Sequence, residues 1–344
     1  MVKLFNGKYD ELKGSMPRKD GAVLRKALPW WLLFTVVMSL LPLLISTRSL
    51  RIFIFANFIA IFAMSWDILS GYTGYISFGH PFLIGIAGYT SAILTHEFAV
   101  PLYISMPVAI LLTMAAGTLF FFPALRTRGT YFALVTLAFM EVTYHLVQVV
   151  KPDVTGGSRG LTGLPLVVTG AAANYYVSLF AMLVIGLGLW ILAKSGLGTV
   201  LSAIRMDEDA VSSAGLNTSK FKLFAFTLSA LVAGIGGVLY THYLGSISPR
   251  NMFDINFLFT ILIAALIGGE HTIIGPMIGA YFLTFLLELL RPYIPGAWRY
   301  LLYGMIALIV YMYAPNGLFT IVKAVRSRIG SNKIKGEEYD RQTA

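Results

Sequence analysis

The sequence contains no cysteine and very little charge. Only 12% of its 344 residues are Asp, Glu, Lys or Arg, about half the share in a soluble domain, while 57% are hydrophobic and the mean hydropathy is +0.75. The absence of cysteine excludes disulfide bonds, thiol catalysis and thiolate metal sites. The shortage of charge excludes intrinsic disorder and a water-soluble enzyme, which would lack the polar surface to cover itself. The class that remains is a helical protein that crosses a membrane several times.

The few charges are mostly positive. There are 26 Lys and Arg residues against 16 Asp and Glu, for a formal net charge of +10. In a soluble protein, this excess would suggest a nucleic-acid partner. Here the basic residues lie in polar segments between apolar runs, where the positive-inside rule places them. We therefore predict a lipid bilayer, and no nucleic acid, as the partner of these charges.

Ten apolar runs are candidates for membrane spans. They cover residues 27–45, 52–69, 80–95, 101–123, 130–150, 175–193, 223–245, 256–268, 274–290 and 299–314. If both termini are cytoplasmic, 19 of the 26 basic residues lie inside and 7 outside, whereas changing the count by one separates the two basic tails. We predict an all-α, polytopic helical bundle of about ten spans in the cell membrane. Residues 1–29 and 316–344 would be cytoplasmic tails, and residues 30–315 the membrane domain.

Two Gly-rich segments, 70–90 and 268–281, interrupt this pattern. Neither can form one straight helix, and non-helical backbone survives at membrane depth only where protein or a wet cavity satisfies its polar groups. The order of Gly, Pro and small residues is similar in both, which is a weak internal repeat. Paired breaks of this kind are typical of a transport pathway at a repeat interface, and the alternative is close helix packing. The helix-breaking residues are Gly71, Gly74, Gly79, Pro81, Gly275 and Pro276.

A few ionisable residues fall inside the apolar runs, where they are costly. Asp67 lies at the end of one run, and we expect it to cap the break at Ser70–Gly71. Glu141 and His145 are four residues apart and share a helix face, which suits either a proton relay or a buried pair. The five His residues are scattered without a carboxylate cluster, so we predict no metal site and no catalytic centre.

Five blocks of sequence follow one another in an informative order. They are WDILSGYTGYISFGHPFLIGIAGYTSAIL (66–94), RTRGTYFALVTLAF (126–139), TGGSRGLTGLP (155–165), GLGTVLSAIRMDEDAVSSAGLNTSKFKLFAFTLSALVAGIGGVLY (196–240) and ISPRNMFDINFLFTILIAALIGGEHTIIGPMIGA (247–280). In this order they resemble the branched-chain amino-acid ABC-transporter permeases, the LivM-type subunit in particular. Any one Gly-rich block would be weak evidence, but the resemblance covers roughly residues 50–315.

The resemblance implies a subunit of an ATP-driven importer that moves branched-chain or other apolar amino acids into the cytoplasm. It implies a second, LivH-type permease, two cytoplasmic ATPase subunits and an extracytoplasmic binding protein as partners. The chain has no G-x-x-x-x-G-K-[ST] phosphate loop, so we expect ATP on the partner subunits, no cofactor here, and no enzymatic activity of this chain. Two alternatives stay open: a urea or short-amide ABC permease, and an ion-coupled secondary transporter.

The polar segment 194–222 resembles the cytoplasmic coupling loop of these permeases. In the family pattern, Glu-Ala is followed by Gly, and here Asp209 separates Glu208 from Ala210. We expect one short amphipathic helix over 204–216, with its charged residues facing water or the ATPase and with Gly215 as its C-terminal cap. The predicted coupling residues are Arg205, Asp207, Glu208, Asp209, Ala210 and Gly215.

An amino-acid zwitterion needs hydrogen-bond donors for its carboxylate and an acceptor for its ammonium group. Backbone N–H groups at the start of a broken helix suit the carboxylate. The polar residues at the two breaks that we predict to line the pathway are Tyr72, Thr73, Ser77 and Thr272, with ordinary helix packing as the alternative for each. The outside loop Thr155–Gly163 is a candidate contact for the binding protein or a simple connector.

Overall fold

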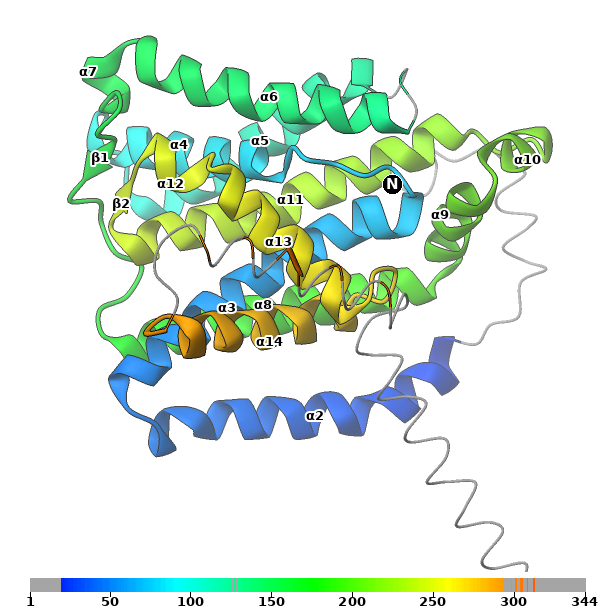
Figure 1. Cartoon of the computed structure of the whole chain (residues 1–344), viewed down its shortest axis with the longest axis horizontal. Helices are drawn as coiled ribbons and strands as arrows, with labels where there is room; N and C mark the ends of the chain where they lie inside the picture. Colours follow the sequence, from blue (N-terminus) through cyan, green and yellow to red (C-terminus); the bar gives the residue numbers. More distant parts are fainter. Residues whose placement is uncertain are drawn as a thin grey trace, which may run out of the picture.

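The computed structural model shows a bundle of helices whose axes run broadly along one direction (Figure 1). It describes residues 20–124, 127 and 129–293, together with positions 298, 301, 304, 305, 308 and 312. Within these residues, the strands are β1 (Leu161–Thr162) and β2 (Ser246–Ile247), which form one antiparallel pair. The predicted all-α bundle is confirmed.

Nine of the ten predicted spans fall within the described residues, and each of them is helical. The helices are α2 (Asp20–Leu44), α3 (Thr47–Trp66), the π-helix η2 (Asp67–Gly71), α4 (His80–His96), α5 (Leu102–Ala124), α6 (Thr130–Val149), α7 (Pro152–Thr155), α8 (Ala171–Lys194), α9 (Gly196–Met206), α10 (Glu208–Ser213), α11 (Thr218–Leu244), α12 (Pro249–Met252), α13 (Ile255–Gly268) and α14 (Ile274–Leu290). Helix α2 begins within the segment 1–29 that we expected as a tail. The rest of that segment, most of the run 299–314 and the tail 316–344 lie outside the described residues.

Six helical segments of the described chain are long and apolar enough to cross a membrane: α3 with η2, α5, α6, α8, α11, and α12 with α13. A membrane span needs about 20 residues, and α4 and α14 have only 17 each. Both short helices directly follow one of the Gly-rich breaks. The chain is therefore a multi-pass membrane protein, and the count of ten spans stays a prediction because it depends on these shorter helices.

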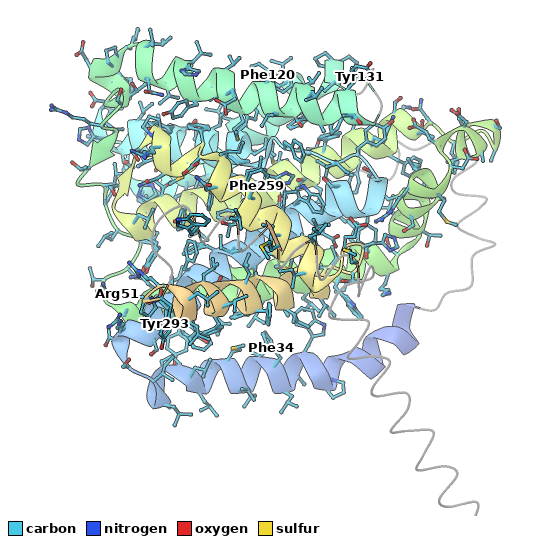
Figure 2. All side chains as sticks on the ribbon, in the orientation of Figure 1. Phe34, Arg51, Phe120, Tyr131, Phe259 and Tyr293 are labelled. Carbon is cyan, nitrogen blue, oxygen red and sulfur yellow. The ribbon has the colours of Figure 1, made fainter. Side chains whose placement is uncertain are left out.

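Burial separates a central group of helices from an outer group. The most apolar stretch of the α3–η2 segment is 83% buried and that of α11 is 61% buried, whereas α6 is only 22% buried. In Figure 1, α6 and α2 form opposite edges of the bundle, while α3 and α11 lie between them. Figure 2 shows Phe120 and Tyr131, which are exposed, at the α6 edge. The apolar outer faces are therefore free to contact lipid or another chain.

Both predicted breaks interrupt the helices. After η2 and the two helical residues Tyr72 and Thr73, residues 74–79 are non-helical, and α4 then begins with Pro81 in its first turn. Between α13 and α14, residues 269–273 are non-helical, and α14 begins with Pro276 in its first turn. Proline suits a first turn because its missing N–H has no helical partner there. The two breaks are thus similar in build, and the internal repeat that this suggests stays a prediction.

Candidate functional site

The first break is held by side chains of the protein itself. The N–H of Ser77 donates to Ser70 Oγ at 3.1 Å, and the N–H of Phe78 donates to Thr136 Oγ1 at 2.9 Å. Trp66 Nε1 donates to the carbonyl of Ser77 at 2.9 Å. Backbone that leaves a helix at membrane depth needs such partners because no bulk water is available. Ser77 and Gly79 are therefore held in the core, while Gly74 and Ile76 of the same segment stay exposed.

The second break is held by one buried carboxylate. Asp67 Oδ1 accepts the N–H of His271 at 2.5 Å, and Oδ2 accepts the N–H groups of Thr272 at 3.1 Å and Ile273 at 2.9 Å. Asp67 is fully buried. Our expectation that it caps Ser70–Gly71 is wrong. The helix continues through η2 to Gly71, so the N–H groups that follow Asp67 are already used in helical turns.

Two glycines permit these close approaches. A Cβ at Gly71 would overlap the carboxylate of Asp67 and press on the N–H of His271. A Cβ at Gly275 would overlap the carbonyl of Gly269 and the hydroxyl of Thr272. Gly71 ends η2 and Gly275 lies in the first turn of α14, so the prediction that these two residues themselves break a helix is wrong. Both positions need glycine for space.

The polar segment 194–222, which we call the coupling segment, forms two short helices. We had expected a single helix over 204–216. Asp207 adopts an extended conformation between α9 and α10, and its Oδ1 accepts the N–H of Ala210 at 2.9 Å as the N-cap of α10. Gly215 follows the end of α10 with φ +86°, as predicted for a glycine cap. Ile204 is buried, and Val211 and Leu216 pack against the core, so the expected apolar anchors hold the segment in place.

Glu208 faces inward and joins three segments. Its Oε1 accepts Lys222 Nζ at 2.6 Å and Thr218 Oγ1 at 3.1 Å, and its Oε2 accepts the Tyr75 hydroxyl at 2.5 Å. The Lys222 side chain is only 3% exposed and also donates to Tyr75 at 2.9 Å. Burial alone would raise the pKa of Glu208, but the hydrogen bonds from Lys222 and Tyr75 outweigh it and hold that pKa below its usual value. The expectation that Glu208 faces water or a partner is wrong.

Arg205 connects α9 to both breaks. Its Nη1 donates to the carbonyl of Gly71, and its Nη2 forms an ion pair with Glu270 at 2.5 Å. Beside it, Ser202 Oγ and His271 Nε2 are hydrogen-bonded at 2.7 Å. Burial lowers the pKa of His271, and the nearby Arg205 charge lowers it further. Sequence reasoning missed Lys222, Tyr75, Glu270 and His271 as members of this site, because their partners are far away in the chain.

Some of the predicted coupling residues lie on the outward surface of the coupling segment. Asp207, Asp209 and Ala210 are exposed, and Met206 is 88% exposed. In Figure 1, α9 and α10 lie at one end of the bundle and the β1–β2 pair at the other. We call the four residues Met206, Asp207, Asp209 and Ala210 the coupling surface. It is a solvent-facing patch of two acidic and two apolar residues at the end of a membrane protein, where a soluble partner has access.

Of the four predicted pathway residues, Tyr72 and Thr272 lie at the contact between the first helical segment and the second break. Tyr72, Thr73 and Ser77 are buried, and the Tyr72 ring packs against His271 with 4.4 Å between ring centroids. Thr73 donates to the carbonyl of Leu69 at 2.7 Å. Thr272 Oγ1 donates to the carbonyl of Gly269 at 2.7 Å and accepts from the N–H of Gly275. These hydrogen bonds are internal to the chain, and a role in the pathway stays a prediction.

Glu141 and His145 do not form a buried pair. Both are exposed on α6, beside the exposed apolar residues Val142, Leu146 and Val149. They line a shallow apolar groove along this helix. The sequence places Glu141 and His145 on one face of α6, but it does not show whether other helices of the chain cover that face.

The β1–β2 end carries a basic cavity and an ordered loop. A cavity of about 500 Å³ is lined by Arg48, Arg51 and Arg291, with Glu288 paired to Arg291 at 3.4 Å. Figure 2 shows Arg51 near this edge of the bundle, close to α14. The loop Thr155–Gly163 is tied down by the β1–β2 pair and by a hydrogen bond from Thr155 Oγ1 to Val147 at 2.7 Å. In the described part of the chain, no three His, Asp or Glu side chains gather as metal ligands.

Comparisons with known proteins agree with this architecture. A family model described as the branched-chain amino acid transport system / permease component matches residues 49–311. The LivM proteins of Salmonella typhimurium and Escherichia coli, named high-affinity branched-chain amino acid transport system permeases, are each 27% identical to the chain over 94% of its length and 81% of theirs. The ribose import permease RbsC of Haemophilus influenzae is 24% identical over 64% of the chain and 70% of its own length.

Proposed function

The chain belongs to the family of branched-chain amino acid transport permeases, and from this premise we propose that it is the membrane subunit of an ATP-driven importer for branched-chain amino acids. The family match covers most of the chain, including both breaks and the coupling segment. The LivM relatives, whose names specify branched-chain amino acids, align over nearly the whole chain. The chain is therefore a component of a transporter and not an enzyme.

The observation that carries the ATP-driven part of the proposal is the contact of α9 with both breaks. Arg205 bonds to Gly71 at the end of η2, just before the first break, and to Glu270 in the second break. A force applied to the coupling surface therefore has a direct route to the non-helical segments inside the bundle. Because the chain has no phosphate loop, ATP would be bound by two cytoplasmic ATPase subunits that dock on the coupling surface, and this chain would hold no cofactor.

The poorly covered α6 face favours a second permease chain beside this one. Glu141 and His145 lie exposed on that face, and an ionisable residue against lipid tails is costly. A neighbouring LivH-type subunit would cover both groups and place the pathway between the two chains. Lipid would then surround the remaining apolar faces, such as that of α2.

The opposite end of the bundle suits the extracytoplasmic binding protein. The three arginines of the basic cavity and the ordered loop Thr155–Gly163 offer a positively charged, shaped surface there. A binding protein with acidic residues would match it by charge complementarity. This assignment gives the β1–β2 end the outside position and the coupling surface the cytoplasmic position, and we propose that both termini are cytoplasmic as well.

The substrate class follows from the relatives, and the candidates for its contacts are Tyr72, Thr73, Ser77 and Thr272. The chain is also similar to a ribose import permease, so likeness to a permease does not by itself fix the solute. Urea or a short amide stays the alternative substrate. An ion-coupled transporter that works without ATPases would instead rely on the exposed Glu141 and His145.

Transport in proteoliposomes tests the proposal. The complex of this chain with its partner permease and ATPases is reconstituted, with labelled leucine and the binding protein outside and ATP or ADP inside. We expect uptake with ATP only, and we expect isoleucine and valine to compete. Competition by urea but not by valine would establish the alternative substrate. Leucine uptake by this chain alone, equal with ATP and ADP, would overturn the ABC importer.

A further inference from the structure

Asp67 is a buried ionisable residue that the proposed function has not yet used. It is 0% exposed, and it lies at the first residue of η2, in the most buried helical segment of the bundle. Its three hydrogen bonds come from consecutive backbone N–H groups, those of His271, Thr272 and Ile273, which are more than 200 residues away in the chain. A side chain with this burial and these partners is a structural clamp between distant segments.

The clamped segment has an unusual backbone. His271 and Ile273 have φ angles of +64° and +61°, in the left-handed region that residues with a Cβ rarely adopt. Hydrogen bonds from backbone N–H groups to a carboxylate are stronger than those between neutral groups. The Asp67 carboxylate therefore holds the second break in a conformation that its residues would not adopt on their own.

The clamp closes a ring through Arg205. From Asp67, the ring passes to His271, to its neighbour Glu270, through the ion pair to Arg205, and through the hydrogen bond to Gly71 back into η2. We call these five residues the Asp67 junction. The hydrogen bond of Ser202 to His271 adds a second link from α9 to the same loop. Arg205 of α9 thus bonds both to η2 and to the loop 269–273. Asp67 already joins that loop to η2.

The π-helix η2 is a part of this ring that could change its conformation. Single π-helical turns inside α-helices are frequently found at functional sites. In this chain, η2 connects α3 to the first break, and Arg205 bonds to its last residue, Gly71. A displacement of α9 would therefore act on η2 and on the loop 269–273 at the same time.

We propose that Asp67 is a positioning residue that makes the two breaks change conformation as one unit when α9 is moved by its partner. The inference rests on the proposed function, since it assigns the driving movement to the ATPases. Asp67 contacts neither substrate nor ATP in this arrangement. Without the Asp67 carboxylate, Arg205 would still bond to Gly71 of η2 and to Glu270. The rest of the loop 269–273 would no longer be bonded to η2, and so it would no longer move with η2.

The first test compares Asp67→Asn with Asn57→Ala. An asparagine has the same shape but replaces one acceptor oxygen with a donor, which opposes the N–H groups of the loop. Asn57 is a matched control because it is also fully buried on α3 and bonds to distant residues, Ser178 and Tyr281, outside the junction. The readout is leucine transported per ATP hydrolysed in the reconstituted complex. A purely structural role would lower both quantities together and leave this ratio unchanged.

We expect the ratio to fall at least about fivefold in Asp67→Asn and to stay within about twofold of the wild type in Asn57→Ala. An unchanged ratio in Asp67→Asn, or an equal fall in both variants, would overturn the proposal. Leucine uptake by the wild-type complex tests the proposed function separately, because the junction is judged only by the comparison among variants.

The second test needs no change in the junction, so it holds even where Asp67→Asn fails to assemble. Since the chain has no cysteine, single cysteines can be introduced at Ile76 in the first break and at Ile278 at the start of α14, which are 51% and 36% exposed. Each carries an environment-sensitive fluorophore, and the complex is mixed rapidly with ATP. We expect both signals to change at rates that agree within about twofold, as one two-state element requires. Rates that differ more than about fivefold, or a response at only one position, would overturn the inference.

Discussion

Several polar residues inside this bundle are paired with residues that are distant in the sequence. Ser65 and Ser229 exchange hydrogen bonds between α3 and α11, and Lys222 finds Glu208 and Tyr75. Each pair removes an unpaired polar group from an apolar environment, where such a group is expensive. The pairs thereby specify which helix faces meet.

Glu208→Gln should destabilise the chain strongly at neutral pH. The change leaves the Lys222 ammonium, which is 3% exposed, without its charged partner, and breaking a buried ion pair in this way costs about 3 kcal/mol or more. We expect a lower midpoint of thermal unfolding in detergent. The double variant Glu208→Gln/Lys222→Met is the control, because it removes both charges and should recover most of the loss. A Glu208→Gln protein as stable as the wild type would contradict the role of this pair.

The same pair predicts how stability depends on pH. The pKa of Glu208 is held below its ordinary value of 4.5, so its contribution is complete above that pH and is lost as the pH falls through the lower value of the folded state. The difference in unfolding midpoint between wild type and Glu208→Gln should therefore be constant from pH 5 to neutral and shrink below about 4.5.

At the scale of elements, the coupling segment is built from helices too short to be stable alone. The six residues of α10 depend on the Asp207 cap, on Gly215 at the other end, and on the inward Glu208. The segment is thus a preformed surface held against the bundle, which lowers the entropic cost of docking a partner.

Gly215→Trp should uncouple transport without preventing membrane insertion. A bulky ring at the end of α10 would stand beside the coupling surface and obstruct the ATPase. Gly170→Trp is the matched control, because Gly170 is also exposed with a positive φ, of +90° against +86°, but lies before α8 at the other end of the bundle. We expect ATP-dependent leucine uptake to fall at least about tenfold in the first variant and to stay within about twofold in the second. Normal uptake with Gly215→Trp would exclude this site as the ATPase contact.

At the scale of the whole molecule, the two ends of the bundle differ in character. One end presents the coupling surface, and the other presents the basic cavity and the β1–β2 pair. Helices α5, α6 and α8 expose long apolar faces between these ends. This arrangement fits the proposal that the molecule has different partners at its two ends and a bilayer or a second permease around its sides.

The orientation in the membrane can be measured on the cysteine-free background. Single cysteines at Ser158 and Met206, both exposed, mark the β1–β2 end and the coupling surface. The basic tails and coupling segment should lie inside, so we expect a membrane-impermeant maleimide to label Ser158→Cys in intact cells and Met206→Cys only after permeabilisation. The unmodified chain controls for background labelling. The reverse labelling pattern would place the β1–β2 end inside the cell and the coupling surface outside, and it would contradict the orientation that import requires.

The sequence by itself determined the class of the protein and the position of its helices along the chain. Apolar runs, Gly-Pro breaks and the cap at Gly215 are local features, and they reflect local physical requirements: a span must be apolar, and a turn needs glycine or proline. For the same reason, both breaks and nine helical runs could be predicted without any structure.

Only the tertiary structure decided which residues meet. It joined Asp67 to the loop at 271–273, turned Glu208 inward to Lys222, and left Glu141 and His145 exposed. None of these outcomes is local, because the partners of Asp67 lie more than 200 residues away. The apolar composition of a helix indicates that it enters a membrane. Its rotation about its own axis, which decides its contacts, is set only when the helices pack together.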